Sequence, residues 1–244
     1  MKSNSSELIE IKPIETRNIP IRIVGDSPLI VHAWSAKAKR EMLEKQIGAT
    51  KTKSREQKNP VEDFCSSLYW LDPMPEVFTR ESVEEAMGLR PRFGFPVTGI
   101  KQAALSAAYR MGWAKDKASM RGAFFLVPDA KGYYSGDLQI DYERKAVKII
   151  PNVFKPDALA EIHSPNPPSM REDMVRVGMG TSDIRYRGQF DNWHMDLTIS
   201  YNVNGQYSIE QIINIINAGG YACGIGEWRP EKDGQSGMFH VEPA

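Results

Sequence analysis

The chain has 244 residues, of which 41% are hydrophobic, and this size fits one large domain or a core with substantial insertions. Its 31 basic and 31 acidic residues exclude nucleic-acid binding by bulk charge alone, and its two cysteines exclude a disulfide framework or a cysteine-rich zinc site. Residues 1–10 lack the basic-then-apolar order of a signal peptide, and no apolar run approaches the roughly 18–20 residues of a membrane span, so we expect a cytoplasmic protein with no membrane partner.

The N-terminal part is predicted to contain a strand, a helix and a basic segment. Residues 1–18 are a loose lead-in, and β-branched residues in 19–31 flank a Gly-Asp-Ser-Pro sequence, which predicts a strand, a turn and a short extended piece. Ser35 can cap a helix that runs to about residue 47. Residues 35–60 hold eight Lys or Arg and three Glu, so this stretch is either a solvated basic loop, mobile at 51–58, or an arm that contacts phosphates.

Three further helices are predicted before residue 112. Asn59 followed by Pro is typical of a helix N-terminus, and a short helix is expected at 81–87. The clearest helix follows Pro96, with Thr98 as its cap. Its apolar face carries Ile100, Ala103, Ala104, Ala107, Ala108 and Met111, and its other faces carry Lys101, Ser106 and Arg110. Because four residues of the apolar face are alanine, we expect this helix to pack very close to its neighbour.

The middle of the chain is predicted to be mostly strand. Residues 123–127 form an uninterrupted apolar run, which is typical of a fully buried strand. Residues 138–142 and 146–150 indicate the two strands of a hairpin. Residues 151–170 contain five prolines and few apolar residues, which indicates a long irregular insertion, and a further strand is expected at 174–179.

The C-terminal part completes the pattern of an α+β fold. Residues 193–201 alternate between apolar and polar, which predicts a half-exposed strand of an antiparallel sheet. Ser208 begins a capping box, and the helix that follows is expected to stop at Gly219-Gly220. Because helices and strands do not alternate regularly, we predict an RRM/ferredoxin-like antiparallel sheet with helices on one face. We interpret residues 1–244 as a single domain with two long insertions. The first, at residues 35–90, is helical and basic, and the second is the Pro-rich segment at residues 151–170.

The sequence lacks the common nucleotide-binding, metalloprotease and serine-hydrolase motifs, so no cofactor and no metal site is predicted and a non-enzymatic role is favoured. The four histidines, His32, His163, His194 and His240, are scattered, and none has a second ligand at metal spacing. His32 follows a strand and precedes a helix, where a general base could reach an RNA 2′-hydroxyl, but a structural or surface role is the simpler interpretation. Cys65 and Cys223 are interpreted as small core residues.

Two segments are rich in residues that suit nucleic acid. Residues 219–237 contain six glycines together with Trp228, Arg229 and Lys232. Backbone amides and the two cations could hold phosphates while the indole stacks on a base. A glycine cap followed by an ordinary hairpin fits this segment equally well. The second segment interleaves basic and aromatic residues: Arg171, Arg176, Arg185, Tyr186, Arg187, Phe190 and Trp193. Its acidic residues equal the arginines in number, so a self-paired surface or a subunit interface is nearly as consistent as a binding site.

Three pieces of the chain resemble the RAMP superfamily, the RRM-like proteins that form the crRNA-binding backbone of CRISPR effector complexes. They are the Phe-Pro-Val-Thr-Gly-Ile-Lys-Gln-Ala sequence at 95–103, the strand pair at 178–201 and the loop and strand at 219–239. In that family a Pro, small residues and a Lys open a helix near the RNA, and a glycine-rich loop joins the last helix to the last strand. The resemblance implies an RRM-like core, insertions acting as palm and thumb, side-by-side self-assembly and a role in CRISPR-associated antiviral defence.

The leading hypothesis is a non-enzymatic protein that binds single-stranded nucleic acid, with RNA favoured, and assembles with copies of itself and other subunits of a complex. The residues expected to contact nucleic acid are Lys101, Arg176, Arg185, Arg187, Trp228, Arg229 and Lys232. One alternative is a viral or mobile-element assembly protein that uses the same fold for protein contacts. The other is a metal-independent endoribonuclease that uses His32.

Overall fold

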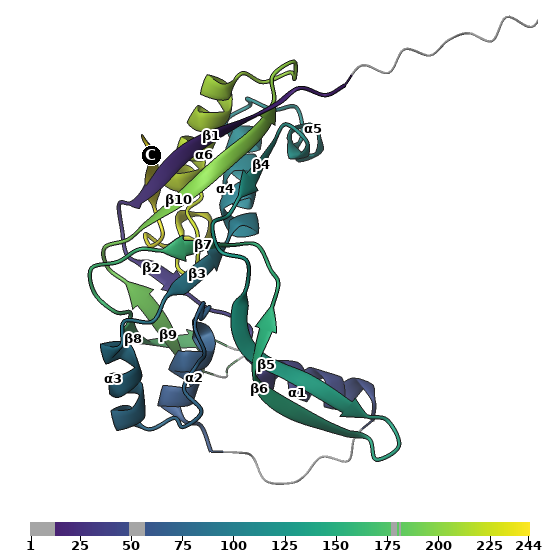
Figure 1. Ribbon diagram of the computed structural model, residues 1–244, viewed down its shortest axis with the longest axis vertical. Helices are drawn as coiled ribbons and strands as arrows, with labels where there is room; N and C mark the ends of the chain where they lie inside the picture. The colour runs from purple at the N-terminus through teal and green to yellow at the C-terminus, as the bar shows by residue number, and fades with distance from the viewer. Residues whose placement is uncertain (1–12, 49–56, 177–179, 181) are drawn as a thin grey trace, which may run out of the picture.

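The computed structural model describes residues 13–48, 57–176, 180 and 182–244, and its largest sheet has four antiparallel strands (Figure 1). The central strands are β1 (Thr16–Gly25) and β10 (His194–Asn202), flanked by β11 (Phe239–Pro243) and β4 (Phe124–Val127). The alternation predicted for residues 193–201 is confirmed, since the apolar set is buried and the polar set lies on the opposite face. The predicted lead-in is shorter than expected, because residues 16–18 already pair with β10.

Two helices cover one face of this sheet. In Figure 1, α4 (Val97–Arg110) and α6 (Ile209–Ala222) lie behind β1 and β10, and the two helices pack on each other. Buried side chains from the strands and the helices form the core between them, among them Ile23, Phe124, Met195, Ile199, Ile100 and Ile212. The mixed α+β class, with antiparallel sheets and helices on one face of the main sheet, is therefore as predicted.

The alanine face of α4 packs against α6, as expected from its small side chains, but three details differ from the prediction. Pro96, not Thr98, is the N-cap, because the helix already begins at Val97. Ser106 is buried, and its hydroxyl accepts a 2.9 Å hydrogen bond from Lys117 of α5 (Lys117–Arg121). Met111 is exposed, because the helix ends one residue before it.

Helix α6 does not stop at Gly219-Gly220 as predicted but continues to Ala222. Both glycines are buried inside the helix, where Gly219 lies against the backbone of Ala104 in α4. Here glycine permits two helices to approach each other, and this tertiary contact outweighs its usual tendency to end a helix.

The prediction of a fully buried strand at 123–127 is wrong. β4 is an edge strand that alternates, with Phe124 buried and Phe125 58% exposed. A short apolar run has no polar residue to reveal which face is open, so periodicity could not separate the two cases.

A second, three-stranded sheet lies below the first and combines β2 (Leu29–Val31), β9 (Ser182–Phe190) and β8 (Ser169–Arg176). Helix α2 (Pro60–Ser67) packs on β9, and α3 (Arg80–Gly88) lies beside it. The predicted helix starts are confirmed, since Asn59 caps α2 and Ser35 caps α1 (Ala36–Gln46). The strand expected at 174–179 is β8, which begins earlier than predicted; residues 177–179 lie outside the described part.

The remaining elements form a projecting hairpin and a small two-stranded sheet. β5 (Tyr133–Asp141) and β6 (Ala146–Lys155) form the predicted hairpin and are longer than predicted at its open end, and α1 packs on them at the lower right of Figure 1. Residues 151–170 are not irregular as predicted: their first residues complete β6, and β7 (Leu159–Ile162) pairs with β3 (Phe93–Pro96). Pairing with a distant strand supplies the order that the local proline content hides.

Both cysteines are buried free thiols, in agreement with their interpretation as core residues, and burial raises the pKa of Cys65 to about 12. Within the described residues, no helix has the length and apolar character that crossing a membrane requires. Of the segment expected to be mobile, residues 51–56 lie outside the described part, whereas Lys58 makes an ion pair with Asp183 of β9 at 2.6 Å.

Candidate nucleic-acid interface

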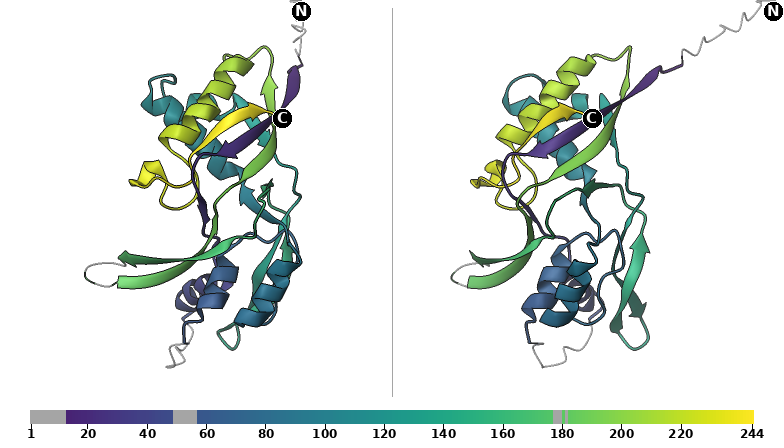
Figure 2. Two further views of the ribbon diagram at one scale, coloured as in Figure 1. Left: turned by 90° about the vertical axis from the view of Figure 1, so that its left-hand side faces the viewer. Right: turned by 60° about the vertical axis from the view of Figure 1, so that its left-hand side comes forward.

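The loop of residues 223–238, between α6 and β11, is held against the strands below it. The backbone N–H of Glu227 donates to the carbonyl of Ile30 in β2 at 2.9 Å, and that of Gly237 donates to Pro28 at 2.8 Å. The loop also contains the short 3₁₀ helix η1 (Pro230–Lys232). In the left view of Figure 2, this loop and the β8–β9 hairpin extend from the same side of the molecule. The backbone bonds fix where the loop presents its side chains.

Arg187 of β9 joins the hairpin to the loop. Its side chain is only 7% exposed, and its guanidinium contacts Asp173 of β8 at 3.1 Å and Glu227 of the loop at 3.4 Å. The arginine Nε has no hydrogen-bond partner among the described residues. Two carboxylates from different elements therefore share one buried cation, which ties together two segments that are separate in the sequence.

One face of the β8–β9 hairpin is lined with alternating charges. Arg171 lies opposite Arg187, and Asp173 lies opposite Arg185, so the antiparallel register brings these four side chains to the same face. Arg171 donates to Asp173 at 2.8 Å, and Arg185 lies 2.9 Å from Asp183. Arg171 and Arg185 are each 40% exposed, so they remain accessible to a ligand even though each has an acidic partner.

The charges of this cluster shift its titrating groups. Burial raises the pKa of Asp173, but hydrogen bonds from Arg171 and Arg187, with a further contribution from Trp228, outweigh this and lower it overall. A hydrogen bond from His32 lowers the pKa of Glu227, and nearby Arg187 acts in the same direction. Both carboxyl groups are therefore ionised at neutral pH, and their negative charge holds the arginines in place.

Acid is expected to destabilise the fold through this cluster. A carboxyl whose pKa is lowered in the folded state stabilises the fold above its unfolded pKa, and this contribution is lost as the pH falls through the folded value. We therefore expect the free energy of unfolding to decline below about pH 4, the ordinary range of Asp and Glu. Urea denaturation followed by tryptophan fluorescence between pH 7 and pH 2.5 measures this, and Glu227→Gln should flatten the dependence. An unchanged profile in that variant would contradict the assignment.

The predicted binding residues of the loop are in place on this surface. Trp228 is 40% exposed and has a positive φ of 53°, an uncommon backbone conformation for a non-glycine residue, and its side chain contributes a hydrogen bond to Asp173 of the hairpin. Arg229 is half-buried, donating to Gly226 at 2.8 Å and lying 3.2 Å from Glu231. Lys232 is exposed on η1 and makes no ion pair with a described residue. Arg176 does not join this surface, because it ends β8 on the face opposite Arg171 and Asp173, where it is exposed.

Lys101 does not join this surface. Its ammonium donates to the carbonyl of Arg121 at 2.7 Å and lies 4.3 Å from the ring centroid of Phe125. It therefore forms a separate cation–aromatic pair at the β4 edge of the main sheet.

His32 lies at the back of the cluster, where its Nδ1 is 3.7 Å from the Glu227 carboxylate. Its side chain is 29% exposed, so the ring remains within reach of a ligand on the loop. The histidine predicted as a lone residue is thus a neighbour of the interface.

Sequence reasoning missed the acidic residues that organise this interface. Asp173 was counted only among the acidic residues that equal the arginines in number, and Glu227 was assigned no role, but each of them binds Arg187. The alternation of Arg171, Asp173 and Val175 on β8 was the available signal, since a period of two places them on one face. The chain matches no protein-family model and no curated protein.

Proposed function

We propose that this chain is a non-enzymatic, RAMP-like protein that binds single-stranded nucleic acid, RNA in preference, as a subunit of a larger assembly. The proposal rests on one observation: Arg187 joins the arginine face of β8–β9 to the loop of residues 223–238. Exposed cations beside an exposed indole suit a strand whose phosphates pair while its bases stack.

The proposal includes an RRM/ferredoxin-like core. In its favour, the main sheet and its helices follow one another as strand, helix, strand, strand, helix and strand: β1, α4, β4, β10, α6 and β11. The first and third of these strands are central, and the second and fourth are at the edges, in the order β11-β1-β10-β4. This order supports a split βαβ fold, into which the β5–β6 and β8–β9 hairpins would be insertions.

Binding is tested with fluorescently labelled 30-nucleotide RNA and DNA single strands, whose anisotropy is measured as the salt concentration increases. We expect saturable binding that weakens with salt, with a logarithmic slope of about 0.7 for each phosphate contacted. Absence of binding to either strand at low salt would overturn the proposal.

The interface is tested with a triple variant, Arg171→Gln, Arg185→Gln and Lys232→Gln. Removing three phosphate contacts should lower the salt slope by about 2 and weaken binding. The matched control is Arg17→Gln, Arg80→Gln and Arg144→Gln, which removes the same charge from side chains that are 63%, 88% and 86% exposed. Equal losses in both triple variants would show that net charge, not this surface, governs binding.

A second candidate is an assembly protein that uses this surface for protein contacts, and a specific observation favours it. Arg171, Arg187 and Arg229 all have acidic partners within 3.5 Å, so much of their charge is already neutralised within the chain. Such a protein would form oligomers without nucleic acid, and the absorbance ratio at 260 and 280 nm of the purified material would show none bound. Light scattering in the presence and absence of RNA distinguishes the two functions. An endoribonuclease would instead cleave RNA and lose this activity in His32→Ala.

A further inference from the structure

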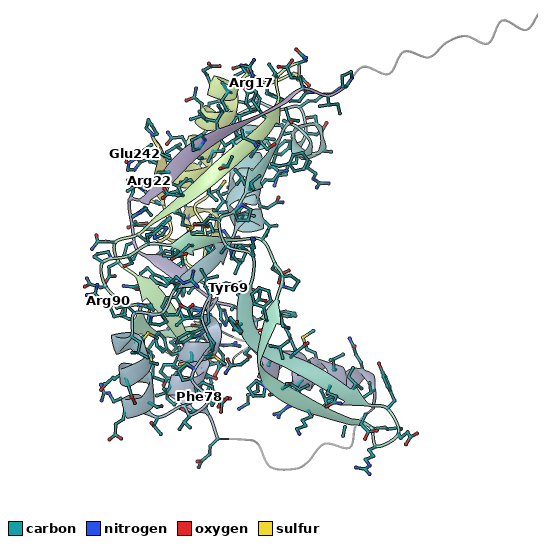
Figure 3. All side chains as sticks on the ribbon, viewed as in Figure 1. Arg17, Arg22, Tyr69, Phe78, Arg90 and Glu242 are labelled. Atoms are coloured by element: carbon teal, nitrogen blue, oxygen red, sulfur yellow. The ribbon has the colours of Figure 1, made fainter. Side chains whose placement is uncertain are left out.

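A cavity of about 660 Å³ lies between the lower end of the main sheet and the β3–β7 pair. Arg22 of β1, Glu242 of β11 and Arg90 line it, and Figure 3 labels all three along the left-hand border of the molecule. His163 and His194 also line it. None of the cavity's lining residues belongs to the β8–β9 face or the loop described above, except Phe190 at the end of β9.

The two histidines are held side by side. The N–H of His163 donates to the carbonyl of His194 at 2.9 Å, and the reverse bond is 3.0 Å, so the two residues form an antiparallel bridge. Residues paired in this way project their side chains to the same face. Their rings stack with centroids 5.0 Å apart and an interplanar angle of 23°. No hydrogen bond from a described residue reaches either ring, although both side chains are half-buried.

Asp196 completes the cluster. It lies two residues beyond His194 on β10, and therefore on the same face of the strand. One potential ligand atom from each of the three side chains lies within 4.8 Å of the other two. Arg22 holds the Asp196 carboxylate with bonds of 2.7 and 3.0 Å, which fixes its orientation while each oxygen keeps a second lone pair.

We propose that His163, His194 and Asp196 form a binding site for a divalent transition metal, zinc above all, with an open coordination position toward the cavity. Two imidazole nitrogens and one carboxylate oxygen are a ligand set that zinc accepts while leaving a fourth position free. Metal–ligand bonds of roughly 2.0–2.2 Å need the three ligand atoms to move together by about 1 Å, which small side-chain rotations supply. The positive charge of Arg22 is opposed by both Asp196 and Glu242. The site is independent of the proposed nucleic-acid interface.

The site is tested on the full chain after removal of metal with a chelator. Cobalt(II) is added and its visible absorption is measured, and zinc is then titrated calorimetrically. We expect one ion per chain. His163→Ala and His194→Ala should each weaken binding by at least about 100-fold, because the loss of a direct ligand costs no less than the loss of an outer-shell partner, which costs about 10–100-fold. His240→Ala is the control, because that histidine lies on β11 with Asp26 and Glu242 as its partners, and it should keep the wild-type affinity.

A measurement on the wild-type protein covers the case in which a variant does not fold. Zinc should protect His163 and His194, but not His240, from modification by diethyl pyrocarbonate, as read by peptide mass spectrometry. Absence of cobalt binding by the wild type, or equal protection of all three histidines, would overturn the proposal. RNA binding is measured separately on folded His163→Ala. If this variant loses zinc but still binds RNA, the metal site and the proposed function are shown to be tested independently.

Discussion

Replacing Arg187 with alanine is expected to lower the free energy of unfolding by about 1–3 kcal/mol, because it leaves a buried acceptor of Asp173 unsatisfied and removes the cation that Asp173 shares with Glu227. Arg187 and Asp173 have side chains that are 7% and 6% exposed, so water cannot replace the lost bond, although Arg171 and Trp228 remain as partners of Asp173. Urea denaturation followed by circular dichroism measures the loss. A further consequence is that the loop of residues 223–238 should lose its ion pair to the hairpin, since Glu227 contacts β9 through Arg187.

Arg185→Ala is the matched control for this prediction. It removes an arginine from the same strand and face, but its side chain is 40% exposed and its partner Asp183 also binds Lys58. A solvent-exposed pair of this kind contributes about 0–1 kcal/mol. If both variants lost the same small amount, Arg187 would not be the link between loop and hairpin. If the two variants differ as expected, Arg187 is a structural residue, whereas Arg185 is a residue that a phosphate can reach.

Gly219→Ala is expected to destabilise the protein by about 1–3 kcal/mol or more, although alanine ordinarily favours a helix. An added Cβ would lie 2.7 Å from the backbone nitrogen of Ala104 and 2.9 Å from the carbonyl carbon of Ala103. These are backbone atoms of α4, so no side chain can rotate away and the two helices must separate. Thermal and urea denaturation report the loss of stability.

Gly88→Ala is the control for the packing of α4 on α6. Gly88 is the last residue of α3, and nothing lies within 4 Å of the position that its Cβ would take. The same substitution should therefore be neutral or stabilise by up to about 1 kcal/mol. A neutral Gly219→Ala would mean that α4 and α6 do not approach as closely as the structure has them.

Sequence reasoning succeeded where a signal lay within a few neighbouring residues. The caps at Ser35, Asn59 and Ser208 were read correctly, because a side chain three residues away at most satisfies the first N–H groups of a helix. The alternation at 193–201 was equally clear. Sequence reasoning failed at Gly219-Gly220, at β4 and at β7, where a partner far along the chain decided the conformation.

The candidate sites also combine features that local sequence predicted with features that it could not predict. The sequence located the arginines and Trp228 that line the candidate interface, because basic and aromatic residues cluster locally there. It could not reveal that Arg187 is buried between Asp173 and Glu227, nor that His163 stands beside His194.

By itself, then, the sequence determined the helix starts at Ser35, Asn59 and Ser208, the alternating strand and the α+β class, since hydrogen bonds and periodicity over one or two turns suffice for these. Only the tertiary structure decided which face of β4 is open, why α6 runs through two glycines and which charges are shared. The physical reason is that burial and ion pairing depend on the distance between side chains in space, and strand pairing brings together residues that the sequence holds far apart.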